Sequence, residues 1–106
     1  MSEIKTISRV LGQAADGSLW FFCNGCDLPH SLNVGPGPGP RWGYNGIAEA
    51  PTFTPSVLSR YGMHGKDVVC HSFVTDGRIQ YLGDCTHALA GQTVDLPNWE
   101  ESWANW

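Results

Sequence analysis

Four cysteines and four histidines are the residues of this 106-residue chain that point most directly to chemistry. Cys23 and Cys26 form a Cys-x-x-Cys knuckle between two short strand candidates, a spacing that lets two thiolates face one ion. Cys70 and Cys85 lie far downstream, on either side of the dipeptide Asp76-Gly77. We predict a structural Zn²⁺ held by Cys23, Cys26, Cys70 and Cys85, which clamps the early knuckle to the late segment.

The ligand set stays open on sequence alone. His30, His71 and His87 each lie near a cysteine, and three cysteines with one histidine, or two of each, would also complete a tetrahedron. Four unliganded buried cysteines are the alternative without metal, because free cysteine packs as a small apolar residue. A thiolate-rich set favours a structural ion, since a catalytic ion keeps an open position. A catalytic centre that uses His71 and His87 is a further alternative.

Serine chemistry requires a hydroxyl beside a base, with a third group that orients the base. Side chains alternate between the two faces of a strand. If Cys70 faces the metal, His71 therefore faces away and is free to act as a base. Ser56, held just after a proline, His71 and Asp84 form the candidate catalytic set. The alternative is structural, because serines of this kind commonly bond nearby backbone groups.

The segment from Cys70 to His87 is predicted to be the hairpin that carries these residues. Its turn is Asp76-Gly77, the strongest short-range hairpin signal. Cys70 lies six residues before Asp76 and Cys85 eight after Gly77. This mismatch of two would be absorbed by a bulge near Gly83, which would bring the two sulfurs together.

The remaining elements are also predicted to be short strands and turns. The 13 glycines and 7 prolines favour a turn-rich antiparallel β fold. Two prolines make 50–58 an edge strand or a structured loop. We expect one domain over 1–106, stapled by zinc, with at most a short helical turn near 86–90. At least one tryptophan of the Trp-rich tail 98–106 is expected to pack back on the domain.

Composition excludes several classes of protein. The net charge of −4 and the 6 Lys+Arg residues argue against a nucleic-acid binder. The sequence holds no apolar run of the ~18 residues that a membrane helix needs. Met1–Lys5 also lacks the apolar core of a secretory signal. We therefore expect a cytoplasmic protein, where cysteines serve metals more often than disulfides.

Two motifs resemble known families. They are Pro-Thr-Phe-Thr-Pro-Ser-Val-Leu at 51–58 and Cys-His-Ser-Phe-Val-x-Asp-Gly-Arg-Ile-x-Tyr-Leu-x-Asp-Cys-Thr-His-Ala-Leu-Ala-Gly at 70–91. With the knuckle, they resemble small phage and prophage proteins, some of which carry the label "ammonia monooxygenase". Nothing in the sequence supports copper oxygenase chemistry. The resemblance implies a phage-encoded protein that works in a bacterial host cell.

The same pattern, over about residues 19–96, resembles BubE of bacterial ubiquitin-like conjugation operons. That resemblance implies a serine peptidase that processes or removes a ubiquitin-like protein. Ser56 matches its Pro-Ser segment, and all four cysteines match its cysteines. The relatives place the histidine three residues after the cysteine, whereas His71 follows Cys70 directly. Both offsets are odd, so the two side chains still face opposite ways. The longer segment Tyr81–Asp84 leaves the orienting acid open.

Two functions follow from these patterns. One is a zinc-stapled peptidase that cleaves a ubiquitin-like tail lying extended along Pro51–Leu58, with backbone N–H groups of Gly-rich loops as oxyanion donors. The other is a non-enzymatic phage accessory or inhibitor protein with a purely structural zinc. It would bind a basic host factor through Trp42, Tyr44 and the tail 98–106.

Overall fold

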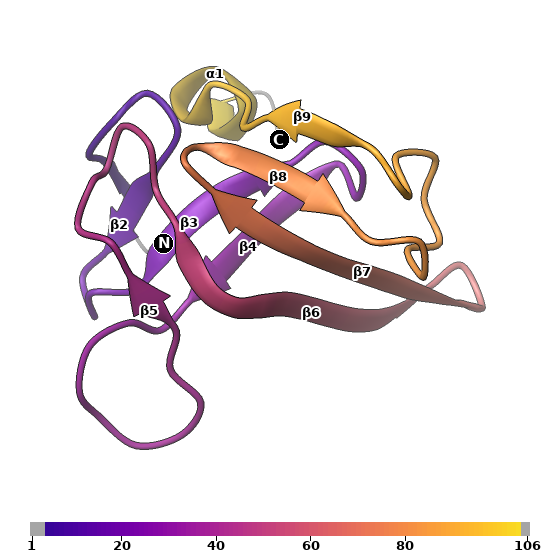
Figure 1. Cartoon of the computed structure of the whole chain (residues 1–106), viewed down its shortest axis with the longest axis horizontal. Helices are drawn as coiled ribbons and strands as arrows, with labels where there is room; N and C mark the ends of the chain where they lie inside the picture. Colours follow the sequence, from indigo (N-terminus) through magenta and orange to yellow (C-terminus); the bar gives the residue numbers. More distant parts are fainter. Residues whose placement is uncertain (1–3, 105–106) are drawn as a thin grey trace.

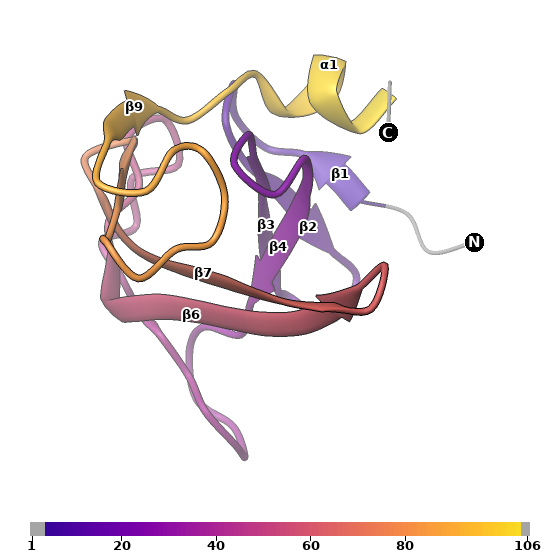
Figure 2. The ribbon, with the colours of Figure 1, turned by 90° about the vertical axis from the view of Figure 1, so that its right-hand side faces the viewer.

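A computed structural model describes residues 4–104, which form two antiparallel β-sheets and one short helix (Figures 1 and 2). The first sheet has the order β1-β2-β3-β4 and the second β5-β6-β7-β8-β9. The first-sheet strands are β1 (Ile4–Thr6), β2 (Gly12–Ala14), β3 (Leu19–Cys23) and β4 (Leu28–Leu32). The second-sheet strands are β5 (Gly43–Tyr44), β6 (Phe53–Met63), β7 (Lys66–Thr75), β8 (Arg78–Tyr81) and β9 (Thr93–Asp95). The prediction of a mainly β fold is confirmed.

One apolar core lies between the two sheets. Phe21 of β3 stacks on Phe53 of β6 with ring centroids 6.4 Å apart, and both rings are buried. Val57, Val74 and other inward-facing side chains of the second sheet belong to the same core cluster. In β7 the buried residues Cys70, Ser72 and Val74 alternate with more exposed ones, which leaves the opposite face of this strand open to solvent.

Two hairpins with primed-type turns build the centre of the second sheet. The β7–β8 turn is Asp76-Gly77, with φ of 51° and 78°, so the predicted hairpin is confirmed. The β6–β7 turn is His64-Gly65, with φ of 54° and 76°. Positive φ at both central residues matches the right-handed twist of the flanking strands.

The segment predicted as an edge strand or loop at 50–58 lies largely within a central strand. β6 runs from Phe53 to Met63 and lies between β5 and β7. Pro55 is tolerated because the pairing with β7 shifts register between Phe53 and Val57, where a backbone donor is not required.

The helical segment lies later than expected. Residues 86–90 form bends and turns, whereas α1 spans Trp99–Ala104. Asn98 caps α1, because its side-chain oxygen accepts the backbone N–H of Glu101 at 2.9 Å. Trp99 is fully buried, which confirms that the tail packs back. No helix among residues 4–104 is long and apolar enough to cross a bilayer.

Candidate active site and metal cluster

Ser56, His71 and Asp84 lie together on the solvent side of the second sheet. His71 Nε2 lies 2.9 Å from Ser56 Oγ, and His71 Nδ1 lies 3.1 Å from Asp84 Oδ2. Both separations are of hydrogen-bonding length, and the two pairs share one imidazole. The arrangement has the connectivity of a hydroxyl, a base and an orienting acid.

Strand register explains why Ser56 and His71 meet. Leu58 of β6 pairs with His71 of β7, and Val57 pairs with Ser72. Ser56 therefore lies diagonally across the strand pair from His71, a separation that long side chains and rings can span. The register shift just before Val57 also releases Ser56 from regular pairing with β7.

Asp84 lies in an irregular segment of residues 82–86 that follows β8, the excursion. Leu82 donates its N–H to the carbonyl of His71 at 2.9 Å, and Thr86 donates to the carbonyl of Val69 at 2.9 Å. If the regular pairing of β7 with β8 continued, Asp84 would lie opposite Val69. Thr86 bonds to Val69 instead, so this segment contains two residues more than regular pairing would need. This offset agrees with the mismatch expected near Gly83, and it projects the Asp84 carboxylate toward the imidazole.

The hydrogen-bond partners define one tautomer of His71. A carboxylate accepts only, so Nδ1 carries the proton and donates it to Asp84, while Nε2 accepts the hydroxyl proton of Ser56. The His71 side chain is 26% exposed and that of Asp84 is 57% exposed. The imidazole and the carboxylate are thus both partly open to solvent.

Trp42 holds the backbone of the candidate nucleophile. Its indole N–H donates to the carbonyl of Ser56 at 3.2 Å. Trp42 itself is fixed by a parallel bridge to Val34 and by its own N–H, which donates to the carbonyl of Asn33. Sequence reasoning assigned Trp42 only to a partner surface and missed this contact.

Three sulfurs and one imidazole gather on the opposite, buried side of β7. Ligand atoms of Cys23, Cys26, His30 and Cys70 all lie within 4.8 Å of one another. The sulfurs of Cys23 and Cys70 are 3.8 Å apart. The edge of a tetrahedron with Zn–S bonds of ~2.3 Å is about 3.8 Å, so this pair already has the spacing of a zinc site. This cluster could hold a metal such as zinc.

Two further observations fit a cation in this cluster. His30 Nε2 is buried and has no hydrogen-bond partner among the described residues, which is costly unless something binds it. The backbone N–H of Cys26 donates to the sulfur of Cys23 at 3.3 Å. Such N–H···S contacts favour the thiolate form that binds metals.

Hydrogen bonding within the cluster separates the pKa values of its thiols. Bonds from the side chains of Cys26 and Cys70 hold the pKa of Cys23 below its ordinary value. The same contact with Cys23 raises the pKa of Cys70. Burial disfavours the charged form of His30, but its contacts with Cys23 and Cys26 outweigh burial and raise its pKa to about 9. These shifts favour a thiolate at Cys23, a neutral thiol at Cys70 and a protonated imidazole at His30.

His30, and not Cys85, lies with the other three cysteines in this cluster. Cys85 belongs to a second group, with Cys70 and His87. In that group His87 Nδ1 accepts the backbone N–H of Leu89 at 3.2 Å. A metal-bound histidine ordinarily donates a proton from its other nitrogen, so this contact does not favour His87 as a ligand.

The aromatic residues expected to form a partner surface are not freely exposed. Trp99 is fully buried, and Trp42 and Tyr44 are half-buried against the core. Trp103 stacks on Trp99 with ring centroids 5.3 Å apart. Trp106 lies outside the described residues. The two tryptophans in the described part of the tail therefore pack mainly within the domain.

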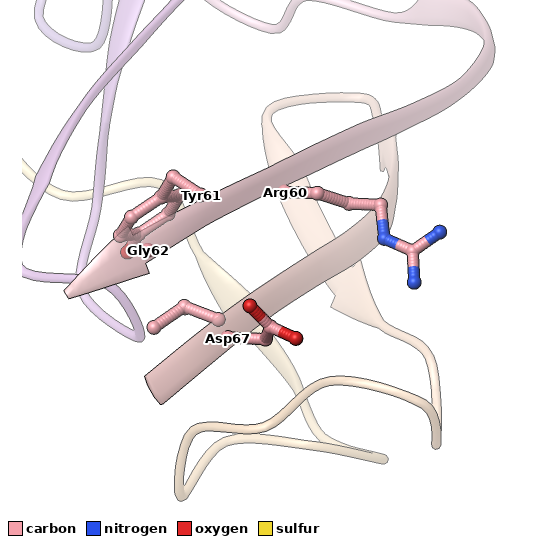
Figure 3. Close-up of a pocket in the computed structure, with 5 residues that line it drawn as sticks. Arg60, Tyr61, Gly62 and Asp67 are labelled. Carbon is pink, nitrogen blue, oxygen red and sulfur yellow. The ribbon is translucent and has the colours of Figure 1, made fainter. Parts of the chain in front are cut away.

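Two hollows lie along β6. One, of about 340 Å³, lies at the far end of the β6–β7 hairpin and is lined by Arg60, Tyr61, Gly62, Asp67 and Val68. Figure 3 shows its Arg60 side chain directed away from Asp67. The other, of about 260 Å³, lies between β4 and β6 beside Trp42 and Val57. The second is lined by residues 57–59, which directly follow the candidate nucleophile in β6.

Residues 2–82 match the model of a family described as the bacterial ubiquitination-like system serine protease (BubE). The chain belongs to the BubE family. The match includes Ser56, His71, Trp42 and the whole Cys/His cluster, and it ends two residues before Asp84. Comparisons with curated proteins and with solved structures found no match.

Proposed function

We propose that this BubE-family protein is a serine peptidase of a bacterial ubiquitination-like system. The observation that carries the proposal is the continuous chain of contacts from Ser56 Oγ through His71 to Asp84 Oδ2, at 2.9 and 3.1 Å. The description of the family supports the same reaction class. Its substrate would be a protein partner of such a system, with a ubiquitin-like modifier as the first candidate.

Each residue of the set has one role in the proposed reaction. Ser56 Oγ attacks the scissile carbonyl carbon while His71 Nε2 takes the hydroxyl proton. Asp84 stabilises the imidazolium that forms and keeps Nδ1 protonated. His71 then gives its proton to the leaving amine, and water hydrolyses the acyl-enzyme by the same steps in reverse.

An extended peptide fits the surface beside Ser56. The hollow between the sheets is lined by residues 28–32 of β4, by Trp42 and by residues 57–59 of β6. β4 is the last strand of its sheet, and β5 pairs with β6 only at Phe53 and Thr54. A substrate tail could add its backbone to the strand edge that follows Ser56. Exposed Leu58 and Phe73 would offer apolar contacts to its side chains.

Zinc in this proposal is structural. Cys23, Cys26, His30 and Cys70 supply four protein ligands, which fill a tetrahedral site and leave no open position. Bound there, the ion would join the β3–β4 knuckle of the first sheet to β7 of the second. Its contribution would be to fix the strand that carries His71, and the chemistry would belong to Ser56 and His71.

A fluorophosphonate probe tests the proposal directly, because a serine activated by a base attacks its phosphorus and displaces fluoride, which leaves the serine phosphonylated. We expect the purified protein to be labelled at Ser56. Labelling should disappear in Ser56→Ala, while Ser102→Ala in α1, remote from the site, should label as wild type does. Equal labelling of wild type and Ser56→Ala would refute the peptidase assignment, as would no labelling of wild type.

A further inference from the structure

Cys85 contacts both backbone polar groups of the candidate base His71, its N–H and its carbonyl oxygen. The backbone N–H of His71 donates to the sulfur of Cys85 at 3.2 Å, and the Cys85 thiol donates to the carbonyl oxygen of His71 at 3.2 Å. Cys85 is buried, with 8% of its surface exposed. It directly follows Asp84, the residue that faces the imidazole. The Cys85 side chain therefore connects the segment that carries Asp84 to β7, the strand that carries His71.

These contacts are consistent with a protonated thiol and not with a metal-bound thiolate. A thiolate has no proton to donate, so it would place its charge 3.2 Å from the His71 carbonyl oxygen without a hydrogen bond. The thiol both accepts and donates at this position. The sulfur of Cys85 therefore acts as both acceptor and donor toward the backbone of His71.

The excursion has few other constraints near the acid. Gly83 and Asp84 are exposed, and among residues 4–104 the Asp84 side chain hydrogen-bonds only to His71. Leu82 and Thr86 attach the two ends of the excursion to β7. Cys85 is the attachment adjacent to the carboxylate, so its loss would let Asp84 drift relative to Nδ1.

We infer that Cys85 is a positioning residue of the proposed peptidase, which sets the distance and direction of Asp84 toward His71. It acts through Asp84 and does not touch the substrate. The inference rests on the proposed function, because the quantity that Cys85 would control is the orientation of the base. It also removes Cys85 from the ligand set of the metal cluster.

The test measures the fluorophosphonate labelling rate of Ser56, separated into the binding constant of the probe and the limiting rate. We expect Cys85→Ala to lower the limiting rate by about ten- to hundredfold, since small misplacements of catalytic groups have effects of this size. Probe binding, zinc content and the circular dichroism spectrum should stay as in wild type. Cys85→Ser, which keeps a donor and an acceptor, should restore most of the rate.

A double-substitution cycle separates positioning from general destabilisation. If Cys85 acts through Asp84, Cys85→Ala should cost little in an Asp84→Asn background, because the acid has already been removed. Full additivity of the two effects would overturn the inference, as would loss of zinc from Cys85→Ser or an unchanged rate in Cys85→Ala. If wild type itself is not labelled, the proposed function fails, and the positioning role falls with it.

Discussion

The two faces of β7 carry different kinds of site. On the inner face, Cys70 is 2% exposed and shares a closely packed cluster with side chains from the other sheet. On the outer face, the next residue, His71, meets Ser56 from the neighbouring strand and Asp84 from an exposed excursion. The inner site joins elements distant in sequence, whereas the outer site draws on a single sheet.

This difference indicates which interactions hold the residues of each site in place. The outer residues are held by strand register and by a few directed contacts, which leave the acid 57% exposed. The inner residues are largely buried, and three of the four lie on the β3–β4 hairpin of the first sheet, Cys26 in its turn. A change on the inner face should therefore affect folding first, and a change on the outer face should affect rate with little effect on folding.

Removal of metal is the largest expected effect. Structural zinc contributes on the order of 10 kcal/mol in small zinc domains near neutral pH, more than the whole stability of many domains of this size. We expect excess chelator to unfold the protein or to lower its melting temperature sharply, as measured by circular dichroism. An unchanged melting curve, with no metal found by elemental analysis, would contradict the assignment.

The ligand set can be tested in the same assay. His30→Ala should lose zinc and stability, because it removes the buried nitrogen that faces the sulfurs. His87→Ala is the matched control, since it removes another imidazole whose Nε2 is buried without a hydrogen-bond partner among the described residues. We expect His87→Ala to keep its zinc. The reverse pattern would move the ion to the group that contains Cys70 and Cys85.

Asp84→Asn should give a large effect on rate and a small one on stability. The amide no longer stabilises a protonated Nδ1 and favours the wrong tautomer, which in well-studied triads costs up to about 10⁴-fold. Because Asp84 is largely exposed, we expect about 10²- to 10⁴-fold slower labelling of Ser56. Asp95→Asn, in the exposed pair with Arg78 at 2.9 Å, should label at the wild-type rate. Equal labelling of the two variants would exclude Asp84 as the acid.

Trp42→Phe should have the smallest effect of the series. It keeps an aromatic ring but removes the donor to the Ser56 carbonyl, and one such bond is worth about 1 kcal/mol. We expect a roughly fivefold slower labelling rate, since 1.4 kcal/mol corresponds to a factor of ten. Trp20→Phe removes an indole bond to Ser18 in the other sheet and should leave the rate unchanged. If both variants slow labelling equally, Trp42 has no specific role.

Much of the outer site could be predicted because it depends on local rules. Asp76-Gly77 specifies the hairpin turn, and the period of two in a strand places Cys70 and His71 on opposite faces. The two-residue mismatch before Cys85 predicts the excursion that carries Asp84. Each of these inferences uses residues within one hairpin, for which sequence distance sets geometry.

The remaining features depend on contacts between distant segments or on weaker signals. His30 lies diagonally from Cys23 across the β3–β4 pair, on the same face, and only the register of that hairpin reveals it. His64-Gly65 makes a primed turn without the usual Asn or Asp, so the length of β6 was missed. Asn98-Trp99-Glu100-Glu101 resembles a capping box, and this signal could have located α1.

The period of a strand also limits how this chain can change in length. One peptide bond separates Cys70 from His71, and these side chains serve opposite faces of β7. A one-residue insertion between them would turn the imidazole inward, whereas a two-residue insertion would keep both assignments. An offset of three residues would obey the same parity. A substitution in β7 therefore leaves the facing of the other side chains unchanged. An insertion between Cys70 and His71 preserves their facing only if it adds an even number of residues.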